Sequence, residues 1–292
     1  MEYERMIIRP PSEANSLLLP ITIGCSHNKC TFCSTYIGVK FRIRPLEDIK
    51  RDIDKVAKNY SWSLRRVFLE DGDAIIAPQR RLVEALKYLK EKFPNLERIG
   101  TYATPQASLI KSLDELKELH QLGLKIAYMG VETGDEELLK KINKGATYDQ
   151  IVEAGRKMKE AGITLSVTVI LGLGGPEGSE NHALKTARIL SDIDPDFAGA
   201  LTILLVPGTP LHQDWEEGKF TLISPFQSLA ELKLIIENAN FTDCFFTANH
   251  ASNYLPIKAR LPKQKAEVLK LIDEVLETKD MSRLRPEFTR AL

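Results

Sequence analysis

The sequence is poor in cysteine and contains no long apolar run. Only four of its 292 residues are Cys, so a disulfide framework is not expected. The most apolar stretch, residues 163–175, is too short to span a bilayer, and the N-terminus lacks the basic start and apolar core of a secretory signal. These absences argue against a membrane protein and a disulfide-stapled secreted domain, and we expect a cytoplasmic protein.

An excess of charge of either sign is also lacking. Forty Lys and Arg residues balance forty Asp and Glu residues, so nothing predicts a whole-protein attraction to nucleic acid or to anionic membranes. A content of 43% hydrophobic and 27% charged residues is typical of a globular protein. The sequence shows no repeats, no low-complexity segment and no linker that would separate an independent domain.

Apolar runs rich in branched residues alternate with amphipathic helical patterns over the first two thirds of the chain. In the helical segment after Pro45, for example, Ile49, Ile53 and Val56 share one face. Repeated strand and helix patterns predict parallel βα units, although periodicity alone does not choose between a barrel and an open sheet. The expected strands are residues 16–24, 65–71, 97–104, 124–132, 163–173 and 197–206.

Three of the four cysteines, Cys25, Cys30 and Cys33, lie within nine residues directly after the first expected strand. Clustered thiols in a reducing compartment indicate metal ligands or a redox group. Three alternatives fit. A structural zinc site would add His27, and an electron-transfer 4Fe-4S cluster would recruit Cys244. A cluster on three cysteines would leave one iron open to bind a substrate or cofactor.

At this stretch the sequence resembles the radical S-adenosylmethionine (SAM) superfamily, in which three cysteines after the first strand of a partial TIM barrel hold an oxygen-sensitive 4Fe-4S cluster. Phe32 matches the aromatic position before the last cysteine. The spacing of four and then two residues departs from the usual three and then two, which keeps His27 as an alternative ligand. The resemblance implies that SAM binds the open iron and that ferredoxin or flavodoxin donates the electron.

The segment FLEDGDA follows the second expected strand. By resemblance Asp71, Gly72 and Asp73 correspond to the Gly-rich acidic turn that contacts the amino group of SAM. Glycine permits close approach of the backbone, and carboxylates accept hydrogen bonds from an ammonium group. Asp and Gly are also common in ordinary turns, so a simple connection between strand and loop is the alternative.

Later strand ends carry further candidates. By resemblance Glu132, in GVETGDEELLKKINKGAT, faces the ribose of SAM, although a capping box starting at Thr133 also fits this stretch. The resemblance places Ser166 and the backbone near Leu205 and Val206 beside the adenine. Any buried strand followed by a glycine turn has the same pattern.

A polar stretch in the final third is the candidate substrate contact. Loops on rigid scaffolds often carry binding chemistry, and His250 is the candidate catalytic residue. The alternative is that Asn and Ser form turns here and that His250 is structural. The polar residues of this stretch are Asn249, His250, Ser252, Asn253 and Tyr254.

The sequence therefore predicts an α/β fold. A partial TIM barrel of six βα units spans residues 15–210, between an N-terminal segment (1–14) and a helical C-terminal extension (211–292). The implied activity is cleavage of SAM to a 5′-deoxyadenosyl radical that abstracts hydrogen from an unidentified substrate, with the reaction subclass open. No second cysteine cluster is present, which favours a small molecule over a peptide, and a nucleic acid is not expected. A zinc-stabilised binding or regulatory protein and an iron-sulfur electron carrier are the alternatives.

Overall fold

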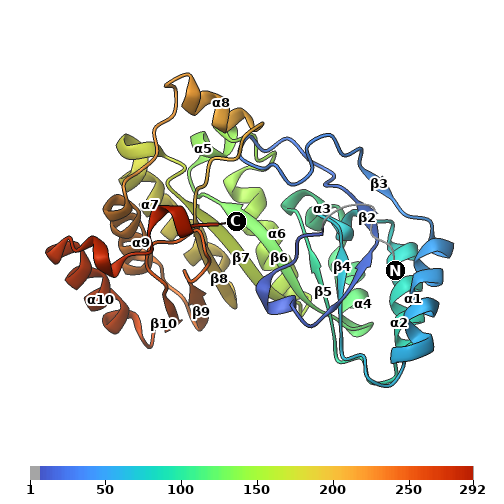
Figure 1. The fold of residues 1–292 in the computed structure, drawn as a ribbon. Coiled ribbons are helices and arrows are strands. Elements are labelled where there is room, and N and C mark those ends of the chain that lie inside the picture. Colours follow the sequence, from blue (N-terminus) through green and yellow to red (C-terminus); the bar gives the residue numbers. More distant parts are fainter. Residues whose placement is uncertain (1–6, 292) are drawn as a thin grey trace. The chain divides into compact units, whose positions relative to one another are not determined.

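A computed structural model describes residues 7–291 of the chain, which divide into two compact units. Unit 1 takes in the described residues up to 28 together with 35–129 and 154–165. Unit 2 takes in 29–34, 130–153 and the described residues from 166 onward. The elements of each unit can be followed in Figure 1.

The strands form an eight-stranded sheet in the order β1-β4-β5-β6-β7-β8-β9-β10, and β2 and β3 form a separate antiparallel pair. In unit 1, β1, β4, β5 and β6 pair in parallel. In unit 2, β7, β8 and β9 pair in parallel, and β10 runs antiparallel to β9. The strand bounds are β1 (Leu17–Pro20), β2 (Thr22–Ile23), β3 (Arg42–Ile43), β4 (Arg66–Glu70), β5 (Arg98–Tyr102), β6 (Leu124–Glu132), β7 (Thr164–Leu171), β8 (Phe197–Thr202), β9 (Cys244–Thr247) and β10 (Lys258–Leu261).

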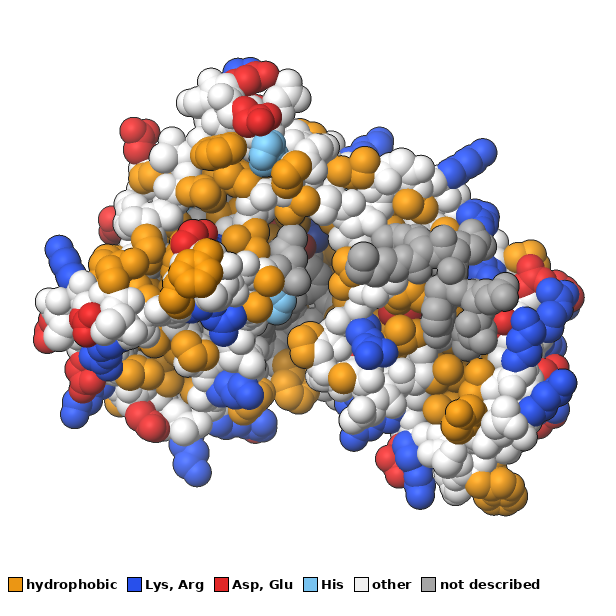
Figure 2. All heavy atoms as spheres, viewed as in Figure 1, with side chains coloured by type: hydrophobic (Ala, Val, Ile, Leu, Met, Phe, Trp, Pro, Cys, Tyr) orange, Lys and Arg blue, Asp and Glu red, His pale blue; other side chains and the backbone are white. Residues whose placement is uncertain are grey.

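Helices occupy the connections between the parallel strands. None of the helices in the described part of the chain is long and apolar enough to cross a membrane. Figure 2 shows basic and acidic side chains interspersed over the displayed face, as equal totals of the two lead one to expect. The helix bounds are α1 (Leu46–Tyr60), α2 (Gln79–Lys92), α3 (Pro105–Ile110), α4 (Leu113–Gln121), α5 (Glu136–Lys141), α6 (Tyr148–Glu160), α7 (Gly175–Ile193), α8 (Pro210–Glu216), α9 (Pro225–Asn238) and α10 (Lys265–Thr278).

All six strands expected from the sequence are present, and two successive helices, α5 and α6, follow β6. The C-terminal extension contains helices, as expected, but also β9 and β10, which the sequence analysis missed. The proposed capping box is wrong. The N-cap of α5 is Asp135, whose side chain accepts from the backbone N–H of Glu137. The domain boundary at residue 210 stays a prediction.

Local sequence signals explain several helix starts. At α4, Ser112 and Glu115 form a reciprocal capping box, and at α9, Ser224 and Gln227 do the same. Each box satisfies backbone N–H groups that a helix start leaves without partners. These sequences therefore fix where the two helices begin.

A buried carboxylate ties the N-terminal segment of unit 1 to its strands. Glu13 is fully buried and accepts hydrogen bonds from Arg98 at 2.6 Å, from the Tyr128 hydroxyl at 2.7 Å and from Ser16 at 2.5 Å. A buried charge is tolerated only when it is paired and hydrogen-bonded. The Arg98–Glu13 pair therefore fastens the segment before β1 to β5 and β6.

We predict that Arg98→Met destabilises the protein by about 3 kcal/mol, because it leaves the Glu13 carboxylate buried without its cation. Urea unfolding measures the change. The matched control is Arg65→Met, which removes the exposed Arg65–Glu97 pair and should cost less than about 1 kcal/mol. Equal losses in the two variants would show that the buried pair does not fasten the segment.

Candidate functional site

The three clustered cysteines lie in a loop of little regular structure between β2 and β3. Cys25, Cys30 and Cys33 are all half-buried, whereas Cys244 is fully buried in β9. Cys25 belongs to unit 1, and Cys30 and Cys33 belong to unit 2.

Backbone hydrogen bonds hold the part of the loop in unit 2. The N–H of Thr31 donates to the carbonyl of Ile142 at 2.9 Å, and the carbonyl of Thr31 accepts from the N–H of Leu211 at 3.0 Å. A further bond joins the N–H of Cys33 to the carbonyl of Cys30 at 3.2 Å. Backbone groups at the end of α5 and the start of α8 therefore hold Thr31, the residue after Cys30, in place.

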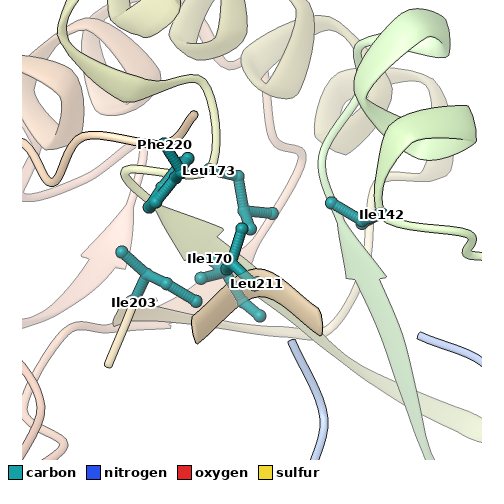
Figure 3. Packing of buried hydrophobic residues seen from close by; sticks show 6 residues of the cluster. All are labelled: Ile142, Ile170, Leu173, Ile203, Leu211 and Phe220. Carbon is teal, nitrogen blue, oxygen red and sulfur yellow. The ribbon is translucent and has the colours of Figure 1, made fainter. Parts of the chain in front are cut away.

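An apolar cluster anchors the same segment through Phe32. The aromatic side chain is partly buried against the cluster, as is Leu205, one of the predicted cofactor-binding residues. Val206 lies in the turn that follows, where its carbonyl accepts from the N–H and hydroxyl of Thr209. The buried members of the cluster, shown in Figure 3, are Ile142, Ile170, Leu173, Ile203, Leu211 and Phe220.

In unit 1 the acidic turn after β4 holds the start of the cysteine loop. The carboxylate of Asp71 accepts from the N–H of Gly24 at 3.0 Å and from the Tyr36 hydroxyl at 2.6 Å. Asp73 accepts from the hydroxyl of Ser26 and from that of Thr104, the latter at 3.0 Å. These two predicted site residues are thus buried partners of the residues on either side of Cys25.

Gly72 lies against Tyr36. A Cβ at this glycine would come within 2.5 Å of the Tyr36 ring, so the close packing of the turn against the loop requires a residue without a side chain. The contact of the acidic turn with the amino group of SAM remains a prediction. The acidic turn at residues 71–73 also holds the cysteine loop in shape, which the sequence does not reveal.

Glu132 ends β6 in an unusual backbone conformation. Its φ is +67°, and the N–H of Thr133 donates to the carbonyl of Val131 at 2.9 Å, which is the hydrogen bond of a γ-turn. The carboxylate lies over Gly130, where a Cβ would come within 2.0 Å of Oε1. Lys144 Nζ lies 2.7 Å from the same oxygen, and both side chains are only 10% exposed.

Lys144 is a functional candidate that the sequence analysis missed. It is 12 residues from Glu132, and no helical or strand periodicity links the two positions. The pair combines an acceptor for hydroxyl groups with a cation that can meet an anionic group. A ligand that carries hydroxyl groups and an anionic group would complement the Glu132–Lys144 pair.

Ser166 is half-buried near the amino end of β7. At about 3.3 Å per residue it lies about 16 Å along the strand from Leu171, whereas the reactive residues of barrel folds lie at the carboxyl ends of strands. Thr168 is on the same face and nearer that end. A role for Ser166 beside the adenine stays a prediction.

The polar loop of the C-terminal extension docks on the end of β8. The side chain of Asn253 accepts from the Thr202 hydroxyl at 2.8 Å and donates to the carbonyl of Ala200 at 2.8 Å. Arg290 donates to the carbonyls of Ser252 and Ile203 at 2.6 and 3.0 Å. The loop is therefore held from both sides within unit 2.

His250 has a defined protonation pattern in this loop. The N–H of Ser252 donates to its Nδ1 at 3.2 Å, so the proton of the neutral ring is on Nε2. Burial, and then the nearby positive charge of Arg285, lower the pKa of His250 below its usual 6.5. At neutral pH the ring is thus an uncharged hydrogen-bond donor at Nε2.

The donor set of the loop suits iron. Three thiols are provided, and soft thiolate ligands favour iron-sulfur clusters and zinc. Among residues 7–291, no three His, Cys, Asp or Glu side chains already form a metal-holding group. The fit therefore rests on the number, kind and partial exposure of the thiols.

The α/β fold carries a loop with three cysteines after its first strand and polar residues at the ends of later strands. This combination is typical of a class of enzymes that bind a cofactor at the carboxyl ends of parallel strands. A model of the radical SAM superfamily matches residues 19–190, which is more than half of the chain. The chain therefore belongs to the radical SAM superfamily.

Two curated relatives and one solved structure illustrate the similarity. The chain is 25% identical over 212 residues to 3-methylornithine synthase of Methanosarcina barkeri, covering 71% of this chain and 54% of that protein. It is 24% identical over 201 residues to tRNA-2-methylthio-N(6)-dimethylallyladenosine synthase of Clostridium tetani, covering 68% of this chain and 44% of that protein. The chain thus matches about half the length of these relatives.

The crystal structure of coproporphyrinogen III oxidase (HemN) from Escherichia coli, a radical SAM enzyme, has a similar fold. The TM-score is 0.58 at 20% identity, over 76% of this chain and 51% of that chain. The likeness confirms the predicted partial TIM barrel, with its mostly parallel sheet and alternating helices.

The protonation of His250 is directly testable. We predict that its imidazole titrates below pH 6.5 in the folded protein, because burial and Arg285 disfavour the charged ring. Since the folded-state pKa is lowered, the stabilising contribution of this group is fully present above the unfolded pKa of about 6.5, and it is lost as the pH falls from there through the lower folded-state pKa. NMR of the ring nitrogens measures the titration, with His250→Gln identifying the signal. A midpoint above 6.5 would contradict the described environment.

Proposed function

We propose that Cys25, Cys30 and Cys33 ligate a 4Fe-4S cluster and that the enzyme cleaves SAM to abstract hydrogen from a small molecule. The observation that carries the proposal is the three-thiol loop within the matched range of the superfamily, with Phe32 anchoring it in unit 2. When bound, the cluster would supply the electron that converts SAM to methionine and a 5′-deoxyadenosyl radical. The protein binds and orients the reactants and excludes water.

The condition of Cys244 favours three ligands over four. This thiol is fully buried in β9, and burial raises its pKa to about 12. Iron and zinc bind the thiolate, which this environment disfavours. An electron carrier that recruits Cys244, one alternative from the sequence, is therefore the weaker proposal. A zinc site with His27 is distinguished from the cluster by measuring the zinc and iron content of the protein.

For SAM binding we assign the strand-end pair to the two polar parts of the cofactor. The Glu132 carboxylate accepts hydrogen bonds from the ribose hydroxyls, and Lys144 supplies a positive charge for an anionic group. In the described structure the two side chains neutralise each other at 2.7 Å. A ligand with hydroxyls and a carboxylate can replace that contact, since the hydroxyls donate to Glu132 and the carboxylate pairs with Lys144.

The remaining SAM contacts are proposed from the sequence positions. Asp71 and Asp73 contact the amino group while holding the loop, and Gly72 allows close approach. Ser166, Leu205 and Val206 line the adenine side. Each is carried over from the superfamily resemblance.

On the substrate side we assign the polar loop of the extension. A 5′-deoxyadenosyl radical reacts with the nearest suitable hydrogen, so the substrate must be held in place and water excluded. His250 offers an uncharged donor at Nε2, on a loop that Asn253 and Arg290 fasten to the end of β8. One relative is named for methylornithine, a small molecule, and another for a modified tRNA nucleoside. We favour the small molecule.

An external electron donor is part of the proposal, with ferredoxin or flavodoxin as the expected partner in the cytoplasm. Residues 25–45, which include the three thiols, contain four Lys or Arg and no Asp or Glu. In unit 1, Lys40 and Arg42 of this stretch are exposed. Basic side chains next to the thiols would attract an acidic redox protein.

Anaerobic reconstitution tests the ligand set. We predict that the wild-type protein binds about four irons per chain, that Ala substitution of any one of Cys25, Cys30 and Cys33 prevents stable assembly, and that Cys244→Ala and His27→Ala retain the cluster. Iron, sulfide and zinc analysis with absorption spectra measures the outcome. Loss of the cluster in Cys244→Ala would contradict the open-iron proposal, and stoichiometric zinc in place of iron would support the structural zinc site.

A second experiment tests the cofactor pocket. Glu132→Ala should retain the cluster but weaken SAM binding by roughly ten- to hundredfold, because hydrogen bonds to a charged acceptor contribute about 1.5 to 3 kcal/mol. Equilibrium binding to the reconstituted protein measures the affinity. The exposed Glu137, which pairs with Lys140 on α5, gives the matched control Glu137→Ala, with affinity unchanged. An unaltered affinity in a folded Glu132→Ala variant would remove this residue from the pocket.

A further inference from the structure

A fully buried histidine and glutamate link the C-terminal extension to the strand ends of unit 2. His182 on α7 and Glu231 on α9 are 0% and 1% exposed, and His182 Nε2 lies 3.2 Å from Glu231 Oε1 and 3.0 Å from the carbonyl of Ile170. Burying two ionisable groups is costly unless every polar atom has a partner. The His182–Glu231 pair has no role in the proposed function.

On one side the pair reaches the residue next to Glu132. His182 Nδ1 lies 2.8 Å from the hydroxyl of Thr133, and that hydroxyl accepts from the N–H of Asp135 at 2.9 Å. The Glu231 carboxylate and the Ile170 carbonyl beside Nε2 are both acceptors, so Nε2 carries the proton of the neutral ring and Nδ1 accepts from the Thr133 hydroxyl. The orientation of Thr133 is fixed by these contacts.

On the other side the pair reaches the turn after β7. Glu231 Oε1 accepts from the N–H of Gly172 at 2.7 Å, and Oε2 accepts from the Ser179 hydroxyl at 2.5 Å. Gly172 has a φ of +88°, which glycine adopts without strain. Glu231, on helix α9 of the C-terminal extension, thus holds the end of β7 directly and the end of β6 through His182.

The γ-turn at Glu132 explains why Thr133 has to be held in place. A residue other than glycine at positive φ is strained, and this kind of turn persists only where neighbouring contacts enforce it. The N–H of Thr133 closes the turn, and its side chain is the part that His182 fixes. Releasing Thr133 would let Glu132 relax toward an ordinary backbone conformation and carry its carboxylate away.

We propose that His182 is a positioning residue that holds Glu132 through Thr133, so that the C-terminal extension sets the affinity for SAM. The inference rests on the proposed function, in which Glu132 contacts the ribose. It gives α9 a role on the cofactor side of the site, in addition to the role of the polar loop on the substrate side.

The test uses Thr133→Val, which removes the hydroxyl while keeping the shape and leaves the His182–Glu231 contact in place. We expect SAM to bind the reconstituted protein about three- to tenfold more weakly, since the hydrogen bonds of the Thr133 hydroxyl with His182 and with the N–H of Asp135 are lost, with iron content unchanged. Thr133→Ser, which restores the hydroxyl, should bind SAM like the wild type. The matched control is Tyr148→Phe, which removes the hydrogen bond to Asp192 on the same α7 and should leave the affinity unchanged.

A double-mutant cycle separates positioning from general stability. In the Glu132→Ala background, Thr133→Val should weaken SAM binding no further, because the residue it positions is already absent. Equal additional weakening in both backgrounds, or wild-type affinity in folded Thr133→Val, overturns the inference. If Glu132→Ala itself leaves the affinity unchanged, the proposed ribose contact fails first, and the inference fails with it.

Discussion

The loop that bears the three thiols depends on hydrogen bonds from other parts of the chain, because it has little regular structure of its own. In unit 1 the carboxylates of Asp71 and Asp73 hold the residues around Cys25, and in unit 2 the backbone of Thr31 is held from both sides. Irregular backbone has no ladder to satisfy its polar groups. The strand ends and helix ends supply partners for these groups, so the scaffold determines the shape of the cysteine loop.

Much of the fold was predictable from the sequence, since β-branched runs and amphipathic helices repeat with clear periods. The strands β9 and β10 were missed because each has four residues and a short run has no distinctive period. The capping box at Thr133 failed for a different reason. Its hydroxyl is engaged by His182, which is 49 residues away, and a local motif carries no information about such a partner.

The sequence offers site candidates where a residue type stands out, as with the clustered thiols, or where the resemblance supplies a position, as with Glu132. It does not reveal residues that act through distant partners. Tyr36 supports the acidic turn across 35 residues, and Lys144 contacts Glu132, whose backbone takes a left-handed conformation that the sequence does not reveal. His182 lies on α7, and no local pattern links it to Thr133. Pairing between remote positions is a property of the folded chain, and a single sequence does not reveal it.

The antiparallel strand β10 also matters for how the protein behaves in solution. It is the last strand in the order of the sheet, and an edge strand offers unpaired backbone groups to other chains. Along β10 the side chains alternate between exposed and buried, with Lys258 and Arg260 exposed, and Pro262 follows directly. Edge-to-edge pairing that leads to aggregation is discouraged by the charge of Lys258, by the hydrogen bonds of the Arg260 N–H and carbonyl with Gln264, and by Pro262, which has no N–H.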